Sequence, residues 1–233
     1  MSEIYFVRHG QASLGARNYD KLSDLGWQQA RWLGEHFREL DLQFDRIIVG
    51  DMQRHQETLQ GIGEGMGLTL TPEVDARLNE FKYFPVLHIY QTIHRPEAKA
   101  PKTAGEFFGM LREVMEAWIT GNLDAAIRQQ DEKQGTKTEN WQDFNQRVVG
   151  ALQHAQTAGA RDKVLIVSSG GPKSLAMKHA LALSDDATIE LMMHIRNTSI
   201  TRFLAAPERT SLRAFNVLTH LERADREHAI TMV

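Results

Sequence analysis

The stretch "VLIVSSGGPKSLAM", residues 164–177, predicts a buried strand, a sharp turn and the start of a helix. Its first four residues are apolar and three of them are β-branched, which is typical of a strand covered on both faces. Gly170, Gly171 and Pro172 follow, and proline is favoured in the first turn of a helix. Because backbone N–H groups and the helix dipole favour negative charge at a helix start, we expect this turn to form one wall of an anion site.

Two earlier runs predict neighbouring strands of the same sheet. They are "IYFV" at 4–7 and "RIIV" at 46–49, and the strand of the opening stretch covers 163–167. Between the first two runs, apolar or small residues recur at helical spacing, at Gly26, Ala30, Leu33, Phe37 and Leu40. A helix in this place would return the chain so that successive strands lie parallel.

The second half of the chain continues the pattern. A helix with Phe144, Val148, Leu152 and Ala155 on one face leads into the strand at 163–167. Alternating residues at 199–205 and 212–218, separated by a turn, predict two further strands. We therefore expect an α/β protein with a mixed sheet and helices on both faces.

Residues 85–140 interrupt this alternation. They contain three prolines, a helical stripe and a long polar stretch, and no strand is evident among them. The prolines are Pro85, Pro96 and Pro101, and the stripe is Phe107, Leu111, Val114 and Trp118. We predict a single domain, 1–233, with a helical insertion at about 85–140 over one edge of the sheet. The insertion is either surface decoration or a lid over the substrate.

Composition limits the classes of partner. The chain has 233 residues and a net charge of −3, so it has no general attraction for nucleic acid or for an acidic membrane surface. It has no cysteine, no apolar run of membrane-spanning length and no basic, apolar start of the signal-peptide kind. We expect a cytoplasmic protein that binds neither nucleic acid nor membrane. The sequence leaves the oligomeric state open, a homodimer included.

Polar residues follow each of the three predicted parallel strands. They are Arg8, His9 and Gly10 after the first, Asp51, Arg54 and His55 after the second, and Ser168 to Gly171 after the third. The carboxyl ends of parallel strands meet at one crevice. Taken singly, these residues are explained as surface ion pairs, a core histidine or a tight turn. Together, two arginine forks, a histidine and an N–H-rich turn predict a site for a phosphoryl group.

Five motifs, in order along the chain, resemble the histidine phosphatase superfamily, also called phosphoglycerate mutase-like. They are "FVRHGQA" (6–12), "LSDLGWQQARWLGEHF" (22–37), "VGDMQRHQETLQ" (49–60), "ARLNEF" (76–81) and "RNTSITRF" (196–203). The third matches at Arg54 and Thr58 but has Gly50, Asp51 and His55 where Ser, Pro and Ala are common. The resemblance implies a three-layer α/β/α sandwich with a mostly parallel, mixed six-stranded sheet.

The resemblance also implies a chemistry. His9 would be the nucleophile that attacks phosphorus and becomes phosphohistidine, and Glu80 would protonate the leaving oxygen. Arg8, Arg54, Ser169 and Gly170 would bind the phosphate, and Ser168 would support the turn. The substrate would be a small phosphomonoester. Neither a metal nor a cofactor is implied, because arginine already meets the phosphate charge.

One departure affects the predicted active site. The family usually has a second histidine where this chain has Ser169. A hydroxyl donates one hydrogen bond but adds no charge, and the loss of such a donor typically costs about 10²- to 10³-fold in rate. His55, or His88 or His94 from the insertion, could supply the missing charge, although each is more simply explained as a surface residue.

Other functions stay open. Ser169 could be a hydrolase nucleophile, but Val167 stands where the nucleophile elbow has its first glycine. A mutase is disfavoured because an aromatic run at 81–84, interrupted by Lys82, stands where the family's mutases have Arg-His-Tyr-Gly. The same aromatic run suggests an aromatic pocket wall and a substrate with an apolar or ring-bearing leaving group. A member without turnover could bind a phosphorylated ligand or a protein partner.

Overall fold

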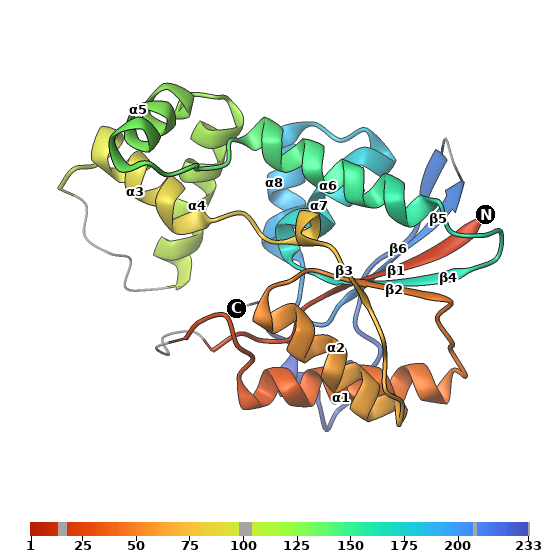
Figure 1. The fold of residues 1–233 in the computed structure, drawn as a ribbon. Helices are drawn as coiled ribbons and strands as arrows, with labels where there is room; N and C mark the ends of the chain where they lie inside the picture. The colour runs from red at the N-terminus through yellow and green to blue at the C-terminus, as the bar shows by residue number, and fades with distance from the viewer. Residues whose placement is uncertain (14–17, 98–103, 207–208, 233) are drawn as a thin grey trace.

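The computed structural model describes residues 1–13, 18–97, 104–206 and 209–232, and within them one mixed sheet of six strands forms the centre (Figure 1). The strands are β1 (Ser2–Arg8), β2 (Arg46–Val49), β3 (Glu73–Val74), β4 (Lys163–Ser168), β5 (Ile200–Ala206) and β6 (Arg209–Val217). Their order is β3-β2-β4-β1-β5-β6. The first four are parallel, whereas β5 is antiparallel to β1 and β6 to β5. The predicted mostly parallel mixed sheet is confirmed.

Helices cover both faces of the sheet. α1 (Asp24–Glu39) and α2 (Gln53–Met66) lie below it in Figure 1, and α6 (Trp141–Gln156), α7 (Gly170–Leu181) and α8 (Asp185–His194) lie above. Along β4, Leu165 and Val167 pack into the cluster between the sheet and helices α1 and α2, whereas Val164 and Ile166 pack into the cluster on the opposite face. This alternation explains why the strand of the opening stretch is apolar throughout.

The helix predicted after the first strand is α1. Ser23 caps its start, because the Ser23 hydroxyl accepts a 3.0 Å hydrogen bond from the Gly26 N–H. Ala30, Leu33 and Phe37 are fully buried, as their spacing predicts. The prediction is wrong for Leu40, which is the C-cap and 57% exposed. The helix ends one residue before the stripe would turn this side chain to the sheet.

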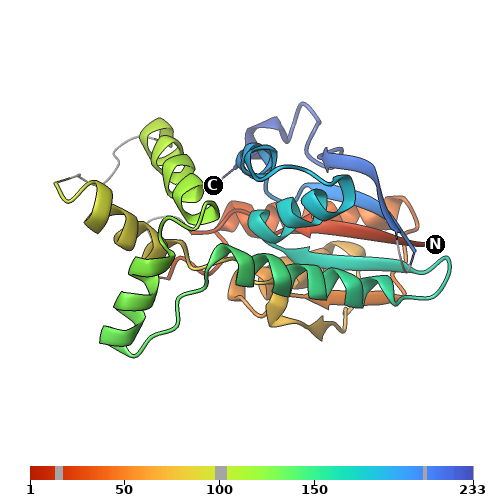
Figure 2. The same ribbon diagram turned by 90° about the horizontal axis from the view of Figure 1, so that it is seen from above.

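The insertion is helical, as expected. α3 (Tyr83–His94), α4 (Ala104–Ile119) and α5 (Asp124–Gln134) extend beyond the carboxyl ends of the parallel strands (Figures 1 and 2), and the described part of 85–140 contains no strand. Val114 and Trp118 are fully buried in α4, and Trp118 packs against Phe81 and Phe144. Pro101 and the side chain of Phe107 lie outside the described residues.

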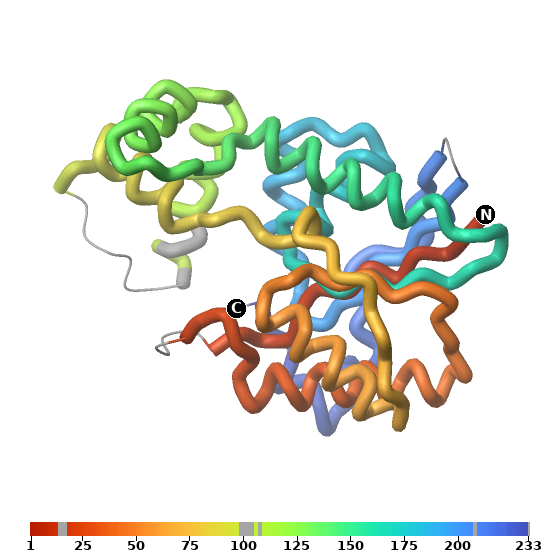
Figure 3. Tube along the Cα trace, viewed as in Figure 1, coloured from red at the N-terminus to blue at the C-terminus, as the bar shows by residue number. Residues whose placement is uncertain are grey.

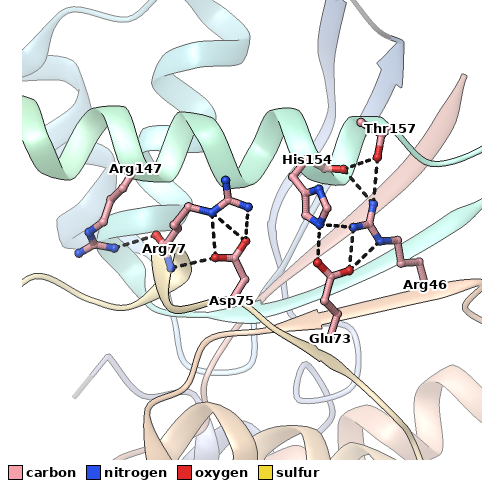
Figure 4. Close-up of polar contacts among 7 residues, drawn as sticks. All are labelled: Arg46, Glu73, Asp75, Arg77, Arg147, His154 and Thr157. Carbon is pink, nitrogen blue, oxygen red and sulfur yellow. Dashed lines mark hydrogen bonds and ion pairs between the residues drawn. The ribbon is translucent and has the colours of Figure 1, made fainter.

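A strand that the sequence pattern did not reveal leads toward the insertion. β3 has only two residues, both exposed, at the edge of the sheet. Figure 3 follows the chain from β3 through the short 3₁₀ helix η1 (Ala76–Leu78) into α3. Glu73 of β3 forms an ion pair with Arg46 of β2 at 2.7 Å and contacts His154 of α6 (Figure 4).

A second 3₁₀ helix, η2 (Glu227–Ala229), packs near the end of the chain. None of the helices in the described part of the chain combines the length and apolarity needed to cross a membrane.

Candidate active site

The structure brings the predicted phosphate-binding residues together at the carboxyl end of the sheet. Arg8 ends β1, Arg54 lies in the first turn of α2 and Ser169 is the N-cap of α7. Nη2 of Arg54 lies 3.5 Å from the Ser169 Oγ. A Cβ built on Gly170 would lie 3.8 Å from the Arg8 Nε. The N-terminus of α7 therefore lies close to both arginines.

His9 is held in one tautomer. It is only 5% exposed, and its Nδ1 lies 2.7 Å from the carbonyl oxygen of Gly10. Because a carbonyl oxygen can only accept, Nδ1 must carry the proton and donate it. In the neutral ring, the lone pair is therefore on Nε2, which is the atom available for attack.

The surroundings keep His9 neutral. Burial, and then the positive charges of Arg54 and Arg8, hold the pKa of His9 well below its usual value of 6.5. The direction of this shift does not follow from the sequence alone, because a bound phosphate and the arginines act on the pKa of His9 in opposite senses. The site therefore presents a neutral imidazole at neutral pH.

The backbone of His9 is fixed by the segment that precedes β5. Nδ2 of Asn197 and the N–H of Thr198 both donate to the His9 carbonyl oxygen, at 3.1 and 3.3 Å. Thr198 has a φ of 53°, which is rare for a β-branched residue and indicates a conformation imposed by its neighbours. The His9 N–H donates to the carbonyl oxygen of Ser168 at 2.8 Å. The late Asn-Thr-Ser motif therefore positions the candidate nucleophile.

Each arginine is held by a partner of its own. Nη1 of Arg8 donates to the carbonyl of Ile195, and burial lowers the pKa of Arg8 to about 10, so it stays charged at neutral pH. Nη1 of Arg54 forms a 2.7 Å ion pair with Asp20, whose other carboxylate oxygen accepts from the N–H of Gln53. Asp20 therefore fixes both the guanidinium and the start of α2, a role that the sequence did not suggest.

Glu80 lies against the start of α7. Its Oε2 accepts from the Gly171 N–H at 3.0 Å, and its Oε1 accepts from the Phe81 N–H at 3.2 Å. From the sequence we expect the N–H groups of Gly170 and Gly171 to be free for an anion. For Gly171 this is wrong, because the carboxylate of Glu80 already occupies that position.

Ser168 is expected from the sequence to support the turn, but its side chain bonds to a residue outside the turn. Its hydroxyl donates to the carbonyl of Leu78 at 2.5 Å, which ties the end of β4 to the segment that carries Glu80. The two other histidines that were considered, His88 and His94, are exposed on α3.

His55 is a correction to the sequence analysis, which explained it as a surface residue. It is fully buried in α2, and its Nε2 lies 2.7 Å from the Ser169 Oγ. Its ring centroid is 5.8 Å from that of His9. Burial and the neighbouring Arg54 hold the pKa of His55 well below its usual range. The sequence signal that could have revealed the burial of His55 is the pair of a small residue at position 169 and a large one at position 55, which face each other in the structure.

Lys173 was missed altogether. It is fully buried in α7, and its Nζ donates to the carbonyl and hydroxyl oxygens of Ser199 at 2.7 and 2.9 Å. Burial, and then the charge of Arg8, hold the pKa of Lys173 well below its usual value. This side chain joins α7 to the segment that fixes His9.

Two of the rings expected in an aromatic wall at 81–84, Phe81 and Phe84, do not lie on one surface. Phe81 is only 7% exposed and packs in the core, with its ring centroid 4.7 Å from that of Trp118. Phe84 is 70% exposed on α3. The structure therefore gives no support for a leaving group chosen by these two rings.

Comparison with known proteins identifies the family. A family model described as histidine phosphatase superfamily, branch 1, matches residues 4–103 and 102–218. The chain belongs to this superfamily. No curated protein matches it in sequence. Among the described residues, no three His, Asp or Glu side chains lie in an arrangement that could hold a metal ion.

Several solved structures share the fold. A phosphoglycerate mutase from Bacillus anthracis superposes with a TM-score of 0.64 at 16% identity over 94% of each chain. A phosphoserine phosphatase mutant from Entamoeba histolytica, in complex with phosphoserine, gives 0.61 at 18% identity over 95% of this chain and 100% of that one. A mycobacterial glucosyl-3-phosphoglycerate phosphatase gives 0.60 at 19% identity over 92% and 98%. These similarities show the fold.

Proposed function

We propose that this protein is a phosphatase that hydrolyses a small phosphomonoester through a phosphohistidine at His9. The observation that carries the proposal is the neutral His9 ring, with Nδ1–H donated to Gly10 and Nε2 unprotonated beside two arginines. In the first step, Nε2 forms a bond to phosphorus while the bond from phosphorus to the ester oxygen breaks. The Nδ1–H bond to Gly10 then stabilises the positive charge that the ring acquires.

Glu80 is the proposed acid. In its protonated form it gives a proton to the leaving ester oxygen, and as a carboxylate it then takes a proton from the attacking water. The water forms a new bond to phosphorus, the bond from phosphorus to Nε2 breaks, and inorganic phosphate leaves. The hydrogen bond between Glu80 and the Gly171 N–H supports this role, since that contact places the carboxyl group of Glu80 one residue from Gly170.

Arg8 and Arg54 are the proposed phosphate ligands. Among the described atoms, Nε of each guanidinium is buried without a hydrogen-bond partner, so each group keeps donor capacity. Two fixed positive charges would stabilise the equatorial oxygens as charge develops on them. We also propose that Ser169 and Gly170 contribute to phosphate binding, because Ser169 lies next to Arg54 and Gly170 lies next to Arg8.

The proposal favours hydrolysis over phosphoryl transfer to a second acidic substrate. After Glu80 the chain continues with Phe81, Lys82, Tyr83 and Phe84 instead of a basic run that would hold a second anion. Of the three solved structures compared above, two are phosphatases and one is a mutase, so the fold alone does not choose between the two activities.

The test is release of p-nitrophenol from p-nitrophenyl phosphate by the wild-type protein and by His9→Ala across pH 5–8. We expect wild-type turnover and a loss of at least about 10³-fold in kcat for the variant, because the nucleophile is removed. Denaturation with detergent at alkaline pH during turnover should trap a phosphorylated protein that is stable to alkali and labile to acid, and that His9→Ala does not form. Equal rates for the two proteins would rule out the proposed phosphatase, whereas phosphate binding without turnover would favour a binding protein.

A further inference from the structure

Three departures from the family pattern meet at one point in the structure. They are Gly50 in place of Ser, His55 in place of Ala, and Ser169 in place of His. The imidazole of His55 reaches the hydroxyl of Ser169, 114 residues away along the chain. A Cβ at position 50 would overlap Nδ1 of His55, so the glycine makes room for the ring. The three residues form one packed group next to Arg54.

The hydrogen bonds define what the pair does. Nδ1 of His55 is buried without a partner, whereas Nε2 lies 2.7 Å from the Ser169 Oγ. In the neutral ring, Nε2 either donates its proton to the Ser169 Oγ or accepts the hydroxyl proton of Ser169, and in both cases this bond joins the ring to Ser169. The same oxygen accepts from Nη2 of Arg54 at 3.5 Å. Arg54 is thus held between Asp20 on one side and Ser169 on the other.

We infer that His55 is a positioning residue of the active site, which acts through Ser169 to hold the Arg54 guanidinium beside His9. The resemblance implies a histidine at position 169; here an imidazole reaches that position from α2, and residue 169 is small so that the ring fits. This inference rests on the proposed phosphatase function. It makes residues 50, 55 and 169 one functional unit.

A serine nucleophile does not explain the same contact. Ser169 and His55 are both fully buried, and the Ser169 hydroxyl lies against His55 and Arg54. Nδ1 of His55 also has no carboxylate to orient it, unlike the histidine of a serine hydrolase. The pair therefore supports the arginine site instead of forming a second catalytic centre.

The experiment is an exchange of the two side chains. Wild type, His55→Ala, Ser169→His and the double variant His55→Ala/Ser169→His are compared for kcat and KM with p-nitrophenyl phosphate and for inhibition by vanadate. His55→Gln is the conservative variant, because its amide can reach Ser169 from the same backbone. His88→Ala, on the exposed face of α3, is the matched control, and circular dichroism and Tm report on folding.

We expect His55→Ala to lower kcat/KM by about 10²-fold, because a misplaced guanidinium loses contact with the phosphoryl oxygens. Ser169→His should also lose activity, since two imidazoles then compete for one buried volume. The double variant should recover to within about tenfold of wild type, and His55→Gln should exceed His55→Ala. If His55→Ala does not fold, the activities of the double variant and of His55→Gln test the inference.

Two results would overturn the inference. One is His55→Ala with wild-type kcat/KM and vanadate inhibition; the other is a double variant no better than the product of the two single effects. These differ from failure of the proposed function, in which His9→Ala keeps wild-type activity. In that case, the affinity of the same variants for inorganic phosphate is measured by calorimetry, and the exchange of the two side chains is judged by binding instead of turnover. A wild-type protein that neither hydrolyses nor binds phosphate overturns both.

Discussion

At the scale of single residues, Gly171 decides where Glu80 can lie. A Cβ at this position would overlap Oε1 of Glu80 and come within 3.1 Å of the Phe144 ring. The N–H of Gly171 binds the same carboxylate. The absence of a side chain therefore allows the candidate acid to sit directly on the start of α7.

Gly171→Ala is expected to lower kcat by about 10²-fold, because the new methyl group displaces the general acid. The measurement is p-nitrophenyl phosphate turnover together with Tm. Gly109→Ala is the matched control, since that glycine faces open space on α4. A kcat within threefold of wild type would show that Glu80 is not held by this contact.

At the scale of elements, η1 and the residues after it set the height of Glu80 above the sheet. Nη1 of Arg147 in α6 donates to the carbonyls of Arg77 and Asn79, each at 2.7 Å. Asp75 binds Arg77 through both carboxylate oxygens, and the Arg77 bonds hold the pKa of Asp75 below its usual value against the opposing effect of burial (Figure 4). The segment is therefore tied to α6.

Arg147→Met is expected to lower the free energy of unfolding by about 1–3 kcal/mol, because two carbonyls lose a charged donor while the methionine still covers Phe144. It should also reduce kcat, since the segment that carries Glu80 loosens. Denaturant unfolding and turnover are the measurements. Arg112→Met removes an exposed arginine with two ion pairs and is the control; an equal loss in both variants would contradict the assigned role.

At the scale of the whole molecule, the interior contains histidines that the fold keeps neutral. His9 and His55 lie at the site, and His220 lies behind it, where its Nε2 is 2.9 Å from the Thr198 Oγ1. Burial, and then nearby His36, Arg226 and Lys173, lower the pKa of His220 to about 3. The unfolded chain takes up protons at these side chains near pH 6.5, whereas the folded chain does not.

Stability should therefore fall as the pH drops below about 6.5, because the unfolded state binds more protons than the folded state. His220 alone accounts for about 2 kcal/mol between pH 7 and pH 5. Urea unfolding at both values, with wild type and His220→Gln, measures this contribution, and His88→Gln is the control. The variant should show a shallower dependence; an unchanged slope would mean that His220 is protonated in the folded state.

Much of the molecule could be read from the chain alone. Short β-branched runs determined β1, β2 and β4, because a strand covered on both faces must be apolar along its length. The residues after those strands predicted Arg8, His9 and Arg54 at one edge, since parallel strands end together. The two-residue β3 was missed because two exposed residues carry no periodic signal.

Only the tertiary structure decided how the site is completed. The contact of His55 with Ser169 joins residues 114 positions apart, and no local pattern records that an imidazole on α2 fills the space next to a serine on α7. Likewise, the sequence predicts a free N–H at Gly171, whereas in the structure this N–H donates to the carboxylate of Glu80. Local periodicity is set by burial along one element, whereas side-chain partners are set by packing between elements, which requires the assembled fold.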